Sequence, residues 1–221
     1  MALPTTNLVA HFDASDTDNL FTTWTAGGNS GVPSDDDEVQ AWEHEGDGSV
    51  GDRMWVYEST ASNSPRWRSV TPLMQLPCLE FDNEQPDVYG LYSQSGGVGI
   101  LSDLISASAC TIAAAFRATG GSANSASPWL NHVLFGELLG YFSLGVRADG
   151  GGNFYLQLYN WDGNLDVVEI QINLFTNYVV IAKHAGGNLD LTLITDGVGS
   201  ESSATPVASG EIGRASCRER V

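Results

Sequence analysis

Three acidic residues alternate in the segment Glu80-Phe-Asp-Asn-Glu84. On an extended strand such residues would share one face, and two carboxylates about 5 to 5.5 Å apart suit hydrolysis of a glycosidic bond with retention. Turn-forming residues interrupt the pattern, however, because Asn83 lies inside it and Gln85-Pro86 follows it. We therefore expect a strand that ends at a turn, and we predict no catalytic residues and a protein that is not an enzyme.

A second segment, Tyr159-Asn-Trp-Asp-Gly-Asn164, has residues that could bind a sugar. In the expected hairpin turn, an aromatic ring is flanked by amide and carboxylate groups that can hydrogen-bond hydroxyl groups. The candidate ligand-binding residues are Tyr159, Asn160, Trp161 and Asp162, with Trp129 after the segment 119–127, which is rich in Gly, Ser and Asn. The alternative is that the tryptophans pack in the core or cover loops.

Metal binding has little support in the residue spacing. The four histidines show no H-x-x-x-H or H-E-x-x-H pattern, so we predict no zinc site. Calcium is an alternative, since acidic loops occur at Asp13 to Asp18 and at Asp35 to Glu38, but neither has the spaced D-x-D-x-D-G pattern. We expect solvated loops and no resident cofactor. His11, His132 and His184 are expected in strands, with their hydrogen bonds satisfied.

Composition narrows the possible partners. The chain has 27 acidic and 9 basic residues, a formal net charge of −18, and such a surface repels phosphate backbones and anionic lipids. We therefore expect no nucleic-acid and no membrane partner. No apolar run approaches the roughly 18 residues of a membrane span, and the N-terminus does not have the pattern of a secretion signal. Cys78 and Cys110 lie in apolar runs, which leaves both buried thiols and a disulfide open.

Short apolar runs separated by turn residues predict the elements that position these side chains. The clearest is a hairpin over residues 177–197, where two strands flank Gly186-Gly187 and end at Asp196-Gly197. Residues 100–106 favour a short helical turn. The other expected strands are 8–13, 39–42, 53–57, one ending near 82, 88–92, 110–117, 132–136, 141–148, 153–159 and 165–172. This succession predicts an all-β fold, an antiparallel two-sheet β-sandwich in a single domain over residues 1–210.

The hairpin over residues 177–197 resembles the late hairpin of concanavalin A-like and laminin G-like jelly-roll domains. An aromatic residue opens a Val-Ala type strand, and a glycine turn leads to a strand of the form L-x-L-x-x-D-G. The start His11-Phe-Asp-Ala-Ser-Asp16 and the segment 65–82 are similar to elements of viral and bacterial domains of this kind. The resemblance implies a concanavalin A-like jelly roll. Glucanases of that fold carry alternating acids on a continuous strand, and Asn83 and Pro86 depart from that pattern.

The last residues, 211–221, differ in composition from the rest of the chain because they are rich in arginine. Their codons can be read as one frame of a common sequencing-adapter oligonucleotide. We therefore expect this tail to be non-native, at the end of an environmental DNA fragment, and the natural chain to continue past about residue 210 into closing strands that are missing here.

The resemblance also implies a biological setting. We expect a virion structural or adhesive module, such as a phage appendage, tail or capsid-decoration protein, assembled in the host cytoplasm with other virion proteins. Such a module would be multivalent or oligomeric and could bind a glycan, since many copies strengthen weak single contacts. A polysaccharide-degrading glycoside hydrolase of the same fold and a cellular adhesion module are the alternatives.

Overall fold

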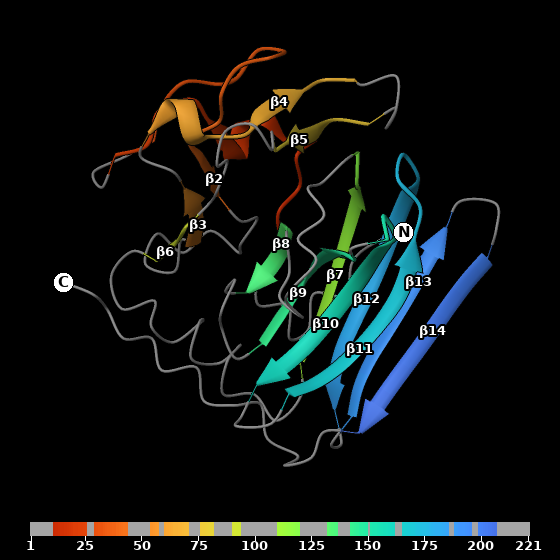
Figure 1. The fold of residues 1–221 in the computed structure, drawn as a ribbon. Helices are drawn as coiled ribbons and strands as arrows, with labels where there is room; N and C mark the ends of the chain where they lie inside the picture. Colours follow the sequence, from red (N-terminus) through yellow and green to blue (C-terminus); the bar gives the residue numbers. More distant parts are fainter. Residues whose placement is uncertain are drawn as a thin grey trace. The chain divides into compact units, whose positions relative to one another are not determined.

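The structure is a computed structural model (Figure 1). It describes residues 11–25, 29–43, 54–57, 60–70, 76–81, 90–93, 110–119, 132–136, 142–149, 151–161, 165–185, 188–195 and 199–206. The chain divides into two compact units, Met1–Leu101 and Ser102–Val221. A single domain over residues 1–210 remains a prediction.

Within its described part, the unit Ser102–Val221 consists of two antiparallel four-stranded sheets (Figure 1). One sheet has the strand order β11-β10-β9-β8 and the other has the order β14-β13-β12-β7. The strands are β7 (Cys110–Arg117), β8 (His132–Gly136), β9 (Phe142–Ala148), β10 (Phe154–Trp161), β11 (Leu165–Ile172), β12 (Asn177–Ala185), β13 (Asn188–Thr195) and β14 (Gly199–Pro206).

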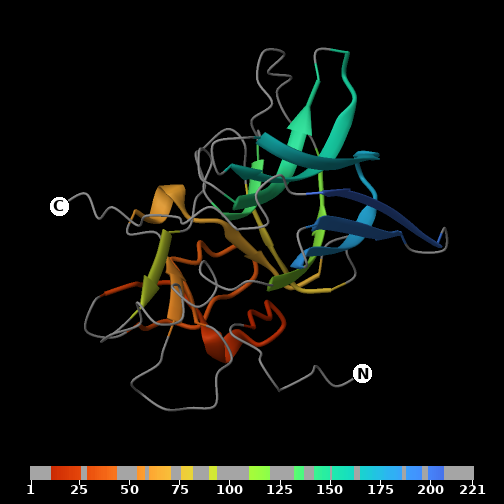
Figure 2. The same cartoon turned by 90° about the horizontal axis from the view of Figure 1, so that it is seen from below.

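One hydrophobic core joins these two sheets. Strand β12 alternates buried and more exposed positions along its whole length, and strand β13 buries Leu189, Leu191 and Leu193. These side chains belong to the same cluster as Leu144, Leu156 and other residues of the first sheet. The two sheets therefore pack face to face, with alternate residues of each strand inside. Figure 2 shows the same strands from a second direction.

The unit Met1–Leu101 has shorter strands. The strands β1 (Leu20–Phe21), β2 (Ala41–Glu43), β3 (Met54–Tyr57) and β6 (Gly90–Ser93) form one sheet, and β4 (Arg66–Arg68) pairs with β5 (Cys78–Glu80). A small core contains Leu20, Val39 and Trp67. The Trp67 indole Nε1–H donates to the carbonyl oxygen of Ala14 at 2.9 Å, which gives this buried aromatic residue a polar partner.

The prediction of an all-β fold with antiparallel sheets is confirmed. In the described residues the only helical segments are two 3₁₀ turns, η1 (Thr17–Asn19) and η2 (Ala61–Asn63). The hairpin predicted over residues 177–197 is present as β12 and β13, which pair from Tyr178 with Thr195 to Ala185 with Asn188. No helix in the described ranges is long and apolar enough to span a bilayer.

Some sequence predictions were wrong. A strand was expected at residues 8–13, of which the structure describes 11–13. These three residues are not part of a strand, and β1 begins only at Leu20. Strand β14 was not predicted because Gly199–Pro206 is polar, but it pairs with β13 over its full length. The helical turn expected at 100–106 and the tail 211–221 lie outside the described residues.

Candidate functional site

A polar surface covers the outer face of the sheet β11-β10-β9-β8. Strand β10 buries Leu156 and Leu158 in the core, so the alternate residues Tyr155 and Gln157 lie on the opposite face. Arg147 of β9 is the register partner of Tyr155, and Glu169 of β11 is that of Gln157. We call this surface the β10 face, defined by Arg147, Tyr155, Gln157, Glu169 and Gln171.

The Glu169 carboxylate gathers two donors on the β10 face. Its Oε2 atom accepts from Arg147 Nη2 at 3.2 Å and from Gln157 Nε2 at 3.2 Å. The Arg147 guanidinium carbon also lies 4.9 Å from the centre of the Tyr155 ring, a cation–π contact. Because Arg147 starts on β9 and reaches β11, its side chain crosses over β10.

Two polar atoms of this surface are buried without a partner. Gln157 is only 2% exposed, and its Oε1 atom has no hydrogen-bond partner in the described part of the chain. The Nε atom of Arg147 is also buried and has no hydrogen-bond partner in the described part of the chain. The amide orientation is fixed, since the opposite one would place Oε1 against the Glu169 carboxylate. The β10 face therefore has one acceptor and one donor still to be satisfied, which is costly for buried atoms.

A tight turn between β9 and β10 holds Tyr155 in place. One oxygen of Asp149, Oδ1, accepts from the backbone N–H groups of Gly151 at 2.8 Å and Asn153 at 2.9 Å. The other, Oδ2, accepts from Asn153 Nδ2 at 2.9 Å and lies 3.5 Å from the Tyr155 hydroxyl. These hydrogen bonds, chiefly those from Asn153, lower the pKa of Asp149, so the carboxylate stays charged in the turn.

The predicted sugar-binding residues fall partly on this strand. Tyr159, Asn160 and Trp161 are the last three residues of β10 and not part of a turn, because the strand continues to a register pair of Trp161 with Leu165. Tyr159 and Trp161 take the alternate positions of β10 that follow Tyr155 and Gln157. The side chains of these three residues, and the whole of Asp162 and Trp129, lie outside the described residues.

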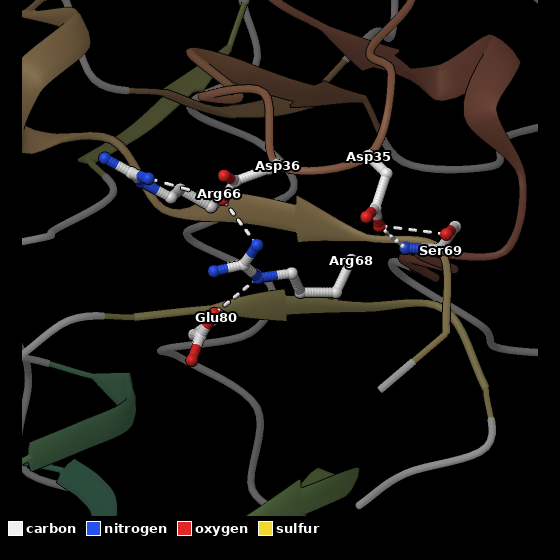
Figure 3. A network of polar contacts seen from close by, with 6 residues as sticks. All are labelled: Asp35, Asp36, Arg66, Arg68, Ser69 and Glu80. Atoms are coloured by element: carbon white, nitrogen blue, oxygen red, sulfur yellow. Dashed lines mark hydrogen bonds and ion pairs between the residues drawn. The ribbon is translucent and has the colours of Figure 1, made fainter. Parts of the chain in front are cut away.

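Arg68 organises a second polar cluster, in the other unit (Figure 3). The Arg68 Nε atom donates to Glu80 Oε2 at 2.5 Å, and its Nη1 atom pairs with Asp36. Arg66 Nη1 lies 3.3 Å from the same Asp36 oxygen. Pairing with Glu80 is the main cause that raises the pKa of Arg68. Residues from the loop 34–37, from β4 and from β5 thus meet around one guanidinium.

Backbone pairing explains why this loop reaches Arg68. The N–H of Asp36 donates to the carbonyl of Trp67 at 2.9 Å, and the N–H of Trp67 donates to Asp37 at 2.9 Å. Next to these, Asp35 Oδ1 accepts from both the backbone N–H and the hydroxyl of Ser69, at 2.7 and 2.9 Å. These bonds lower the pKa of Asp35. The acidic loop is therefore held by hydrogen bonds and ion pairs.

Glu80 is engaged in this cluster, at the last position of β5. The other two acids of the alternating string, Asp82 and Glu84, lie outside the described residues. In the described ranges, no group of three or more His, Cys, Asp or Glu side chains could hold a metal ion. The described residues of this cluster therefore form ion pairs with one another.

Arg68 and Arg66 offer a matched test of this cluster. Replacing Arg68 by methionine removes two ion pairs of a half-buried guanidinium, and we expect the free energy of unfolding to fall by about 0.5–1 kcal/mol. The change Arg66→Met removes a single, more exposed pair and should have no measurable effect. Urea unfolding at low and high salt measures both variants. Equal effects would show that Arg68 does not organise the loop.

His184 is buried in a strand, but within the described ranges it does not make the hydrogen bonds that we expected from the sequence. It faces the core of the Ser102–Val221 unit at 0% exposure, and neither ring nitrogen has a partner among the described residues. The prediction of a histidine with satisfied hydrogen bonds was therefore wrong. Burial lowers the pKa of His184, so the ring is neutral at neutral pH.

Cys78 is a free thiol at a half-buried position of β5. Burial is the main cause that raises the pKa of Cys78, with the nearby Glu80 carboxylate adding to it. A thiol of this kind is protonated and unreactive at neutral pH. The side chain of Cys110 lies outside the described residues.

The two sheets and the β10 face define an all-β protein of antiparallel sheets with a polar surface on one of them. Comparisons with known protein families, with curated proteins and with solved structures gave no match.

Proposed function

We propose that this chain is a non-enzymatic binding module, a concanavalin A-like jelly-roll sandwich that attaches to carbohydrate through the β10 face. One observation carries the proposal. Strand β10 has Tyr155, Gln157, Tyr159 and Trp161 at successive alternate positions, between Arg147 of β9 and Glu169 of β11. Alternate residues of a strand share a face, so these positions belong to the face of β10 on which the side chains of Tyr155 and Gln157 lie.

This combination suits a sugar better than the other common ligands. Aromatic rings offer apolar faces to stack on a pyranose, while amide, carboxylate and guanidinium groups hydrogen-bond its hydroxyl groups. Nucleic acids and anionic membranes are unsuitable partners because the chain carries a formal net charge of −18. The β10 face contains both kinds of groups that a neutral polyhydroxylated ligand needs.

The architecture supports the jelly-roll part of the proposal. Two antiparallel four-stranded sheets share one core in the unit Ser102–Val221, as the resemblance of the 177–197 hairpin implies. The same resemblance motivates a virion structural or adhesive setting, in which the module acts in many copies and binds other virion proteins as well as a glycan. Avidity would then compensate for a shallow single site.

A glycan array tests the binding proposal. We expect the folded chain to bind neutral oligosaccharides, with or without calcium, and Trp161→Ala to reduce that binding at least tenfold, because truncation of an aromatic hot-spot residue costs about 2 kcal/mol or more. The matched control is Phe175→Ala, which removes an exposed aromatic side chain at the turn between β11 and β12.

Two outcomes of the array, and one of an assay for released reducing sugar, would count against the proposal. A blank array from a folded sample would leave a purely structural role. Equal loss in both variants would indicate a general effect on folding. Release of reducing sugar that disappears in Glu80→Gln would identify a glycoside hydrolase and overturn the non-enzymatic assignment.

A further inference from the structure

The two unpartnered atoms of the β10 face indicate which chemical group its ligand presents. Gln157 Oε1 needs a donor, and Arg147 Nε needs an acceptor. Water or a ligand can supply both, but a purely apolar ligand or a simple anion cannot, because the first has neither group and the second cannot donate. A hydroxyl group donates and accepts at once, so it is the simplest group that serves this surface.

The charge of the site selects among hydroxyl-bearing ligands. Arg147 is already paired with Glu169, and Gln157 is neutral, so the central groups have no spare positive charge. A carboxylated or sulfated sugar would bring a further negative charge to a chain that is already strongly acidic. A neutral sugar brings hydroxyl groups without that repulsion.

The structure also shows how a ligand could reach these buried atoms. Gly145, the register partner of Gln157 on β9, contributes no side chain beside the amide. The Arg147 guanidinium lies across β10, but its ion pair with Glu169 is partly exposed, at 19% and 38% of the two side chains. Partly exposed ion pairs contribute little to stability. A movement of the guanidinium that keeps Nε at the site gives up this ion pair and the contact with the Tyr155 ring. Hydrogen bonds from a ligand hydroxyl group to Gln157 Oε1 and Arg147 Nε offset that loss, because both atoms are buried without a partner among the described residues.

We propose that Gln157, Arg147 and Glu169 form a hydroxyl-recognition site for neutral sugars, opened by movement of the Arg147 side chain. This inference rests on the proposed carbohydrate-binding function and adds its location and ligand class. Gln157 accepts from a ligand hydroxyl through Oε1 while its amide nitrogen remains bound to Glu169. Arg147 Nε donates to a hydroxyl oxygen, and Tyr155 supplies the neighbouring ring.

The test uses the full chain and a glycan array that contains both neutral and sialylated or sulfated oligosaccharides, followed by calorimetric titration with the strongest neutral oligosaccharide. We expect Gln157→Leu to weaken binding at least tenfold. This is about the effect of removing one buried hydrogen bond and leaving its partner unpaired. The matched control is Asn188→Leu, which also replaces a side-chain amide by leucine, at an exposed position of β13 in the other sheet. It should leave affinity unchanged.

A second variant covers the case in which Gln157→Leu does not fold. Arg147→Lys keeps a positive charge for Glu169 but removes the Nε–H donor, and it should also weaken binding without changing the midpoint of thermal unfolding. Wild-type affinity in folded Gln157→Leu and Arg147→Lys, with binding lost in Trp161→Ala, would overturn this site but leave the carbohydrate-binding function in place. A preference for acidic sugars would overturn the ligand class. A blank array from folded wild-type protein would overturn both proposals.

Discussion

Replacing Leu191 by alanine is expected to lower the free energy of unfolding of the Ser102–Val221 unit by about 2–5 kcal/mol. Leu191 is 0% exposed on β13, in the cluster that joins the two sheets. The loss combines the transfer free energy of the removed methyl and methylene groups with the cavity that they leave. Chemical unfolding followed by far-ultraviolet circular dichroism measures it.

The control for Leu191 lies on the same strand. Ile194 is 39% exposed on the outer face of the sheet, so Ile194→Ala removes a similar amount of hydrocarbon from a position that is already in contact with water. We expect a change of about 0.5 kcal/mol or less. If the two variants lost equal stability, the face of β13 toward the other sheet would not be the core.

Replacing His184 by leucine is expected to stabilise the protein, and increasingly so as the pH falls. At pH 8 the change removes two buried nitrogens without partners, for a gain of about 1 kcal/mol. Burial lowers the pKa of His184 in the folded state. The unfolded chain therefore binds a proton below its ordinary pKa of about 6.5, while the folded chain does not.

The sign of the pH effect follows from that proton. Wild-type stability should decrease as the pH falls below about 6.5, by at most about 1.4 kcal/mol per pH unit, and the leucine variant should lack this contribution. Unfolding measured from pH 8 to pH 5 tests it. The carboxylates with lowered pKa values, Asp13, Asp35 and Asp149, contribute stability that is lost only at lower pH, below about 3.8.

Lys183→Leu is the control for the histidine variant. Lys183 is the neighbouring residue on β12, and it is exposed. Its substitution should leave the pH dependence of the wild type intact. Parallel pH profiles for wild type and His184→Leu would contradict the burial of a neutral imidazole.

These predictions bear on function through the sheet that carries the β10 face. The inner side chains of β10, Leu156 and Leu158, belong to the same core as Leu191. A rigid core fixes the backbone from which Arg147, Gln157 and Glu169 project, so the polar site depends on packing from the opposite side of the sheet. Binding measurements on core variants therefore need a folding control.

The sequence by itself determined the local elements of the larger unit. The strands expected at 132–136 and 165–172 have those bounds in the structure, and the two strands expected on either side of Gly186-Gly187 pair as β12 and β13. Alternating side chains and glycine turns are local signals, so no distant residue is needed to interpret them. The sequence pattern placed Trp161 in a hairpin turn, whereas in the structure it is the last residue of β10.

Only the tertiary structure decided which distant residues meet. Arg68 lies 32 positions from Asp36, and their pairing depends on the loop 34–37 lying along β4. Strand β14 has a polar sequence and is held by its backbone bonds to β13, which no hydrophobic pattern reveals. Arg147, Gln157 and Glu169 converge because three strands set their register. Register and burial are properties of the whole sheet. The sequence therefore did not show that Gln157 Oε1 and Arg147 Nε are buried without partners in the described part of the chain, or that His184 is fully buried.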